Sequence, residues 1–168
     1  QGLVETAFGR VELNTNGRIV LPSDVSLTSG VGGELILRAP QIDLAGDIRL
    51  PGGTLTVQPV IPTTAPISPE LATVTERVIV RSDAVLSTAG AWVNTASADG
   101  SFVGAPLPSV RRSADGSSTR AIDGGDITIQ IDEREFETRL ERGAVLDVGG
   151  GASIDSRRRI SGGSGGTL

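Results

Sequence analysis

The stretch from Gly33 to Gln58, GELILRAPQIDLAGDIRLPGGTLTVQ, contains four short alternating runs that decide the predicted fold. In each run two aliphatic side chains stand two residues apart, the spacing that places both on one face of a β-strand. The spacers between the runs are too short for the helices that usually connect parallel strands. The pairs are Leu35 and Leu37, Ile42 and Leu44, Ile48 and Leu50, and Leu55 and Val57.

Such short connections fit either a tight meander of hairpins or the corners of a solenoid. A meander needs two-residue Asn-Gly or Asp-Gly turns in hairpin positions. The nearest cases are Asn16-Gly17, Asp99-Gly100 and Asp115-Gly116, and most of them stand in polar loops. The solenoid is therefore the favoured interpretation.

Internal repeats support the solenoid. The segment 84–94, AVLSTAGAWVN, is echoed about 60 residues downstream by 144–155, AVLDVGGGASID. A second repeated unit, here called the second echo, consists of a Gly followed by a strand in which aliphatic residues alternate with other residues. Self-similar strand units of this kind bury their apolar faces only by stacking on one another, at roughly 20 to 25 residues per coil. The Gly-strand units are 33–37, 53–57, 125–129 and 166–168.

At GAVLDVGGGASID and VLSTAGAWVN the sequence resembles the haemagglutinin-repeat part of the filamentous haemagglutinin family, which are exoproteins of two-partner secretion. The resemblance implies a secreted or cell-surface protein associated with the bacterial outer membrane. Together, repeat and resemblance predict an all-β fold, a right-handed single-stranded parallel β-helix with lateral loop excursions over residues 1–168. The last strand signal runs into Leu168, so the chain is expected to be a piece of a longer one.

Two stretches do not fit the coil pattern and are predicted to be excursions: 59–69, which is rich in Pro, and 97–123, which is rich in Ser, Gly and Pro. The charged stretch 132–142 is predicted to be a strand with Phe136, Thr138 and Leu140 inward. The full set predicted to face inward comprises Leu35, Leu37, Ile42, Leu44, Ile48, Leu50, Leu55, Val57, Val78, Val80, Val85, Ile127, Ile129, Val145 and Ile154, and an Asp at position 145 is expected to be strongly destabilising.

Composition excludes several classes of function. The net charge is -5, and all 15 basic residues are Arg, which argues against a nucleic-acid surface. Cys and His are absent, which removes disulfides, thiolate metal sites and most catalytic triads. No apolar run approaches the roughly 20 residues that a membrane helix needs. We therefore expect neither an enzyme nor a cofactor, and neither nucleic acid nor a membrane span as a partner.

The remaining enzymatic alternative is a polysaccharide lyase or glycosidase, because parallel β-helices host both and need only carboxylates, Arg and calcium. A calcium site at 123–126 offers too few oxygen ligands. Carboxylates beside Gly turns are more simply interpreted as caps of backbone N–H groups. The candidate catalytic carboxylates are Asp123, Asp126, Asp147 and Asp155, and of these Asp147 and Asp155 stand beside Gly turns.

The most favoured function is a structural or adhesive segment of a surface filament, and the alternative is a structural subunit of a larger envelope assembly. Expected partners are other protein chains, or more of the same chain, at both solenoid ends, and a host or cell-surface glycan. Trp92 is interpreted as packing under the excursion at Phe102. Candidate contact residues are Trp92, Phe102, Arg111, Arg112, Arg120, Arg157, Arg158 and Arg159.

Overall fold

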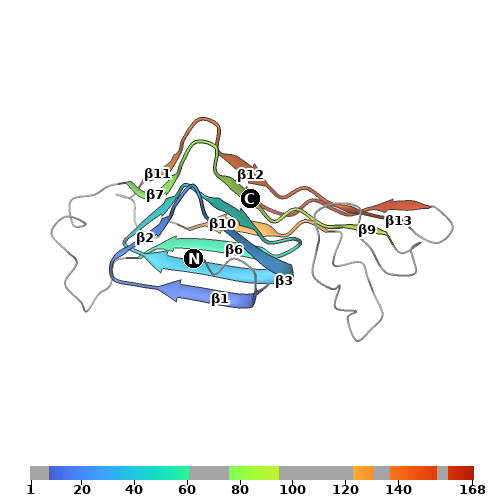
Figure 1. Cartoon of the computed structure of the whole chain (residues 1–168), viewed down its shortest axis with the longest axis horizontal. Coiled ribbons are helices and arrows are strands. Elements are labelled where there is room, and N and C mark those ends of the chain that lie inside the picture. Colours follow the sequence, from blue (N-terminus) through green and yellow to red (C-terminus); the bar gives the residue numbers. More distant parts are fainter. Residues whose placement is uncertain (1–7, 61–75, 95–122, 131–136, 155–158) are drawn as a thin grey trace.

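The computed structural model describes residues 8–60, 76–94, 123–130, 137–154 and 159–168, and within these ranges every helix or strand element is a β-strand (Figure 1). The all-β prediction is therefore confirmed for the described residues. The strands are β1 (Phe8–Asn14), β2 (Arg18–Leu21), β3 (Ser26–Ala39), β4 (Gln41–Leu44), β5 (Asp47–Arg49), β6 (Thr54–Pro59), β7 (Glu76–Val80), β8 (Val85–Ser87), β9 (Trp92–Asn94), β10 (Asp126–Ile129), β11 (Glu137–Leu140), β12 (Val145–Asp147), β13 (Ala152–Ile154) and β14 (Ile160–Gly162).

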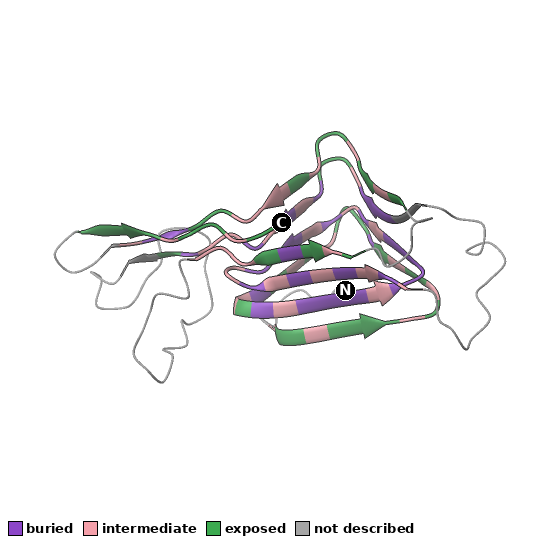
Figure 2. Cartoon of the chain, turned by 180° about the vertical axis from the view of Figure 1, so that it is seen from behind, coloured by how far each residue is buried: buried purple, intermediate pink, exposed green. Residues whose placement is uncertain are grey.

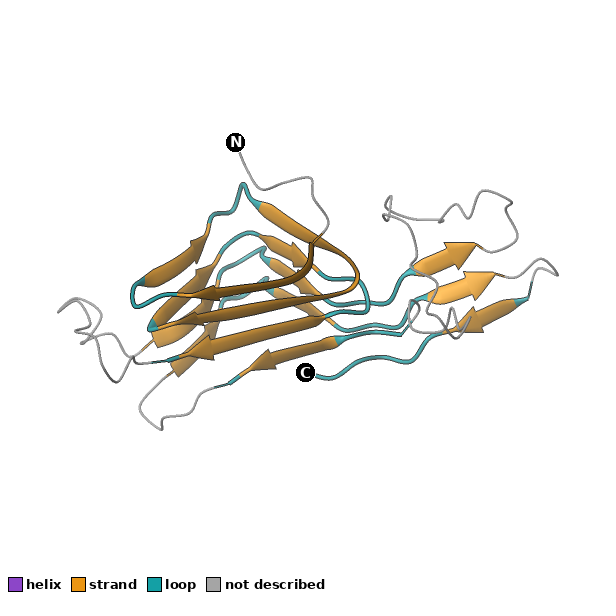
Figure 3. Ribbon diagram, turned by 90° about the horizontal axis from the view of Figure 1, so that it is seen from below, coloured by secondary structure: helices purple, strands orange, loops and turns teal. Residues whose placement is uncertain are grey.

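Three parallel ladders surround the core. The first runs through β1, β3, β6 and β10, the second through β2, β4, β7 and β11, and the third through the start of β3, then β5, β8 and β12. β3 belongs to two ladders, because Ser26–Thr28 pairs with β5 while Glu34–Ala39 pairs with β6. The first and third ladders thereby become one seven-stranded sheet that bends around the core beside the four-stranded sheet (Figure 3).

The predicted β-helical solenoid is therefore wrong as a fold class. That prediction began a strand unit at Gly33 and interpreted the short spacers between the strands as the corners of a solenoid. Instead, β3 begins at Ser26 and continues through the corner, where the Gly-rich stretch lets the chain bend without ending the strand and Gly32 takes a φ of +72°. The described strands make a nearly closed, barrel-like wall of parallel strands. A third sheet beside it contains an antiparallel pair, β13 with β14.

Columns of side chains in register, all aliphatic except Thr138, fill the space inside the wall, and Leu13 and Leu140, which end two of the columns, stay 44% and 49% exposed. Members of each column occupy paired positions on successive strands, and residues from all three ladders join in one hydrophobic cluster (Figure 2). Burial of each Leu, Ile or Val stabilises the fold by roughly 1.5–3 kcal/mol. The columns are Val11, Leu35, Leu55 and Ile127; Leu13, Leu37, Val57 and Ile129; Ile19, Ile42, Val78 and Thr138; Leu21, Leu44, Val80 and Leu140; and Leu27, Ile48, Leu86 and Leu146.

Most of the predicted inward set is confirmed. Ile129 is partly buried and packs against the core, while the side chain of Ile154 lies outside the described residues. The fully confirmed members, all buried, are Leu35, Leu37, Ile42, Leu44, Ile48, Leu50, Leu55, Val57, Val78, Val80 and Ile127.

The prediction that the side chains of Val85 and Val145 face inward is wrong. Val145 is 45% exposed, and Val85, its partner in the ladder, is only partly buried. The neighbouring Leu86 is fully buried and Leu146 packs against the core. An Asp at position 145 would therefore point outward, and the large destabilisation expected for it does not follow.

The strand predicted in the charged stretch is confirmed for β11, but its orientation is only half right. Thr138 is partly buried at the inward position, whereas Leu140 is 49% exposed although it pairs with the buried Val80. The cause is position in the ladder, because among the described strands β11 pairs only with β7. Phe136 lies outside the described residues.

The glycines of the second echo stack directly on one another. A Cβ added to Gly53 would lie within 3.0 Å of the Gly33 carbonyl oxygen, one at Gly125 would meet Gly53 in the same way, and one at Gly166 would meet Gly125. These positions admit no side chain because the backbone of the next strand passes directly beside each of them.

The two predicted excursions fall almost entirely outside the described residues. Pro59 is an exception, because it is the buried last residue of β6 and pairs with Ala39, while the following Val60 donates its N–H to the Ala39 oxygen. A Pro at the end of a strand costs the ladder only its own N–H. Asp123, at the end of the second excursion, is also described.

Candidate functional site

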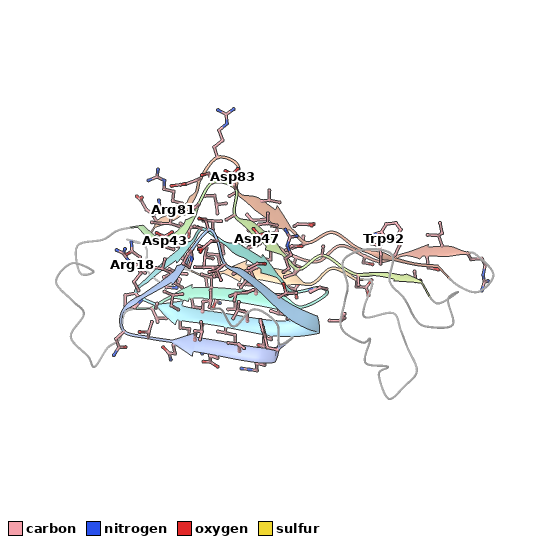
Figure 4. The ribbon with its side chains drawn as sticks, in the orientation of Figure 1. Arg18, Asp43, Asp47, Arg81, Asp83 and Trp92 are labelled. Atoms are coloured by element: carbon pink, nitrogen blue, oxygen red, sulfur yellow. The ribbon has the colours of Figure 1, made fainter. Side chains whose placement is uncertain are left out.

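Trp92 stands on a small sheet beside the main wall. It pairs with Ala152, and Ala152 pairs with Gly162, so its neighbours along the row of the sheet carry little or no side chain. The Trp92 side chain is 52% exposed and points away from the ribbon (Figure 4). Phe102 lies outside the described residues, so the interpretation that Trp92 packs under the excursion at Phe102 stays a prediction.

Of the other predicted contact residues, only Arg159 lies in a described part of the chain. It is exposed and directly precedes β14, the strand at the far side of the small sheet from β9. Trp92 thus begins one edge strand of this three-stranded sheet, and Arg159 directly precedes the other edge strand. The predicted contacts at Phe102, Arg111, Arg112, Arg120, Arg157 and Arg158 lie outside the described residues.

The most strongly connected charged group was not predicted from the sequence. Arg81 follows β7 at a corner of the wall and donates from Nε to Asp43 Oδ1 at 2.8 Å and from Nη2 to Asp43 Oδ2 at 2.6 Å. Its Nη1 donates to Glu141 Oε1 at 3.1 Å. Asp43 lies on β4, next to Arg81 in Figure 4, and Glu141 directly follows β11, so one guanidinium connects three neighbouring strands of the same ladder.

The surroundings of Arg81 and Glu141 favour the charged form of each side chain. The hydrogen bond to Asp43, with Glu141 adding to it, raises the pKa of Arg81. The pKa of Glu141 is lowered, first because its Oε2 accepts the backbone N–H of Ser82 at 3.1 Å and then because of Arg81. The side chains of Asp43 and Glu141 are 15% and 21% exposed, so solvent only partly screens them. The arrangement clamps neighbouring strands of the second ladder.

A second polar row crosses the outer face of the first ladder. Arg38 on β3 donates from Nε to Gln58 Oε1 at 2.6 Å and from Nη1 to Glu12, and Gln58 in turn donates to Gln130. Each of these contacts joins neighbouring strands, so the row reinforces the parallel pairing from outside.

Three of the four carboxylates considered for catalysis accept hydrogen bonds from backbone N–H groups. Asp123 Oδ1 accepts the N–H of Ser164 at 2.8 Å, and Asp126 Oδ1 accepts that of Thr167 at 3.1 Å. Asp147 Oδ1 accepts the N–H of Gly149 at 2.9 Å, which confirms the turn interpretation. The last candidate, Asp155, lies outside the described residues.

Within the ranges that the structure describes, no cluster of three or more acidic side chains could hold a metal ion. The same part of the chain contains no helix long and apolar enough to cross a membrane. No family model, no curated protein and no solved structure matches this chain.

Sequence reasoning missed the charged group although one signal was available. Arg81 and Glu141 are 60 residues apart, the same spacing that separates Ala84 from Ala144 in the internal repeat. Aligning the repeat units three residues further upstream would have placed the two charges side by side.

Proposed function

We propose that this chain is a non-enzymatic segment of a secreted bacterial surface filament, similar to the filamentous haemagglutinin family, and that it presents loops from a rigid scaffold. In this proposal the wall of parallel strands supplies stiffness. The segments between its strands supply contact with other protein chains or with a surface glycan. The location is outside the cell, in association with the outer membrane.

The in-register stacking of the internal repeat carries the proposal. Val85 and Leu86 pair with Val145 and Leu146, and Trp92 pairs with Ala152. Because equivalent sequence units lie directly on one another, each unit completes the core of the next, as in proteins that build long scaffolds from repeats. This favours a mechanical role over a reaction centre.

The position of the interrupting segments gives further support. Residues 61–75 separate β6 from β7, and residues 95–122 separate β9, which carries Trp92, from β10. Function tends to reside on segments inserted between the elements of a scaffold. We therefore assign contact with a partner to these two segments and to the exposed face around Trp92.

Replacement of each segment by a Gly-Ser linker of equal length tests the proposal. The parent chain and both variants would be compared for binding to host cells and to a panel of immobilised glycans, and for thermal unfolding. We expect binding by the parent, loss of binding in at least one variant, and cooperative unfolding in both. Absence of binding by the parent, or full binding by a chain with both segments replaced, would contradict the adhesive role.

A further inference from the structure

Asn16 and Gly17 lie in the short connection between β1 and β2. Asn16 is exposed, and a Cβ added to Gly17 would meet only Thr15 Oγ1, at 3.6 Å. We propose that Asn16 is a site of spontaneous covalent modification, at which the side-chain amide is converted to aspartate and isoaspartate.

The reaction needs only the chain and water. The backbone nitrogen of Gly17 attacks Cγ of Asn16, a C–N bond forms, the Gly17 nitrogen gives up its proton, and the side-chain nitrogen leaves as ammonia. Water then opens the five-membered imide. Attack of water at Cγ gives aspartate, and attack at the main-chain carbonyl carbon gives isoaspartate, in which the backbone runs through the former side chain.

The surroundings of Asn16 leave this attack unobstructed. Gly17 has no Cβ to hinder approach of its nitrogen. The Gly17 N–H donates to Thr15 Oγ1 at 3.1 Å, within the turn itself. The ladder pairing of the two strands ends at Asn14 on one side and starts at Arg18 on the other. The imide ring involves only Asn16 and Gly17, so its closure does not require breaking the hydrogen bond that the Thr15 N–H donates to the Arg38 oxygen of β3.

The other two asparagines of the chain serve as internal controls. Asn14 is held in β1 opposite Arg38 and is followed by Thr15, whose N–H donates to the Arg38 oxygen at 3.0 Å. Asn94 is paired in β9 with Ile154 and is also followed by a threonine. A β-branched successor and a strand conformation both oppose closure of the imide ring.

Modification would alter one end of the main wall. Among the described strands, β1 pairs only with β3, and β2 pairs only with β4. The new carboxylate would stand two residues from the exposed Arg18, and isoaspartate would lengthen the backbone of a three-residue connection.

Incubation of the intact chain in mildly alkaline buffer, followed by peptide mass spectrometry that distinguishes isoaspartate from aspartate, tests the proposal. We expect conversion at Asn16 to be at least about tenfold faster than at Asn14 or Asn94. Gly17→Ala should slow it markedly, and Asn16→Gln should abolish it. Equal rates at the three asparagines would overturn the proposal. So would conversion of Asn16 in the urea-unfolded chain without any in the folded chain, because the turn would then protect the residue.

Discussion

Arg81 and Asp43 form a two-point ion pair between neighbouring strands of one ladder, with both oxygens of the carboxylate accepting from one guanidinium at 2.8 and 2.6 Å. The paired geometry requires a planar donor, which Arg has and Lys lacks. The same guanidinium reaches Glu141 on the other side. The Arg81 side chain therefore connects three neighbouring strands of one ladder.

Arg81→Ala is expected to lower the free energy of unfolding by about 1–2 kcal/mol, because it leaves Asp43, a mostly covered carboxylate, without its partner. Arg81→Lys should lose about half as much, since one contact can survive. Urea unfolding at neutral pH measures both changes.

Arg49→Ala is the matched control for this prediction. Arg49 pairs with Asp47 at 2.9 Å, but both groups belong to one strand and the Arg49 side chain is half exposed. Its removal should cost under about 0.5 kcal/mol. Equal losses for the Arg81 and Arg49 variants would show that the guanidinium does not clamp the strands.

Acid should weaken the contribution of Glu141. Because the pKa of Glu141 is lowered in the folded chain, its charge stabilises the fold at pH values above the ordinary Glu pKa, and this stabilisation is lost as the pH falls through the lowered value. The unfolding free energies of the parent and of Glu141→Gln should therefore differ most near neutral pH and converge in acid. A difference that stays constant with pH would rule out this linkage.

Two side-chain truncations to Ala test which residues of the third ladder face the core. Leu86→Ala should cost about 2–5 kcal/mol, because Leu86 is fully buried in the core. Val145→Ala should change stability by no more than about 0.5 kcal/mol, because Val145 faces outward. A larger loss of stability for Val145→Ala than for Leu86→Ala, in thermal or urea unfolding, would instead support the inward orientation of Val145 that the sequence predicted.

The glycine column predicts several positions that tolerate no side chain, and Gly53 tests them. Gly53→Ala would place a Cβ against the backbone of Gly33, so we expect loss of cooperative unfolding or a large fall in its midpoint. Gly9→Ala, on β1 with no atom within 4 Å of the added Cβ, should leave the midpoint nearly unchanged. Circular dichroism across a thermal scan separates the two outcomes, and an unaffected Gly53→Ala variant would contradict the stacking of the column.

Much of the core could be predicted because several runs between Gly33 and Gln58 alternate clearly. Leu55 and Val57 alternate with Thr54, Thr56 and Gln58, so only one face of that strand can be apolar. At Ala84-Val85-Leu86 three apolar residues follow one another at the start of β8, and alternation alone cannot choose between the faces. The stacking on neighbouring strands fixes which side chains face the core, because Ala84 and Leu86 are both buried.

The charged group and the shape of the wall depend on pairings that local patterns do not encode. Arg81 meets Asp43 across 38 residues and Glu141 across 60. Likewise, whether β3 breaks or bends at its Gly-rich centre depends on β5 and β6, which hold its two halves in different ladders. A prediction from single runs of residues therefore found the strands and missed how two ladders become one sheet.

The in-register stacking of the repeat is tested most directly by disulfide cross-linking, because the chain contains no Cys. Val85 and Val145 are paired on neighbouring parallel strands, and strand spacing of about 4.8 Å falls within the range that a disulfide can span. The double variant V85C/V145C should form an intramolecular disulfide under mild oxidation, seen as a cross-linked peptide pair by mass spectrometry. The displaced pair V85C/D147C should form far less. Equal cross-linking of the two pairs, or none in V85C/V145C, would contradict the account.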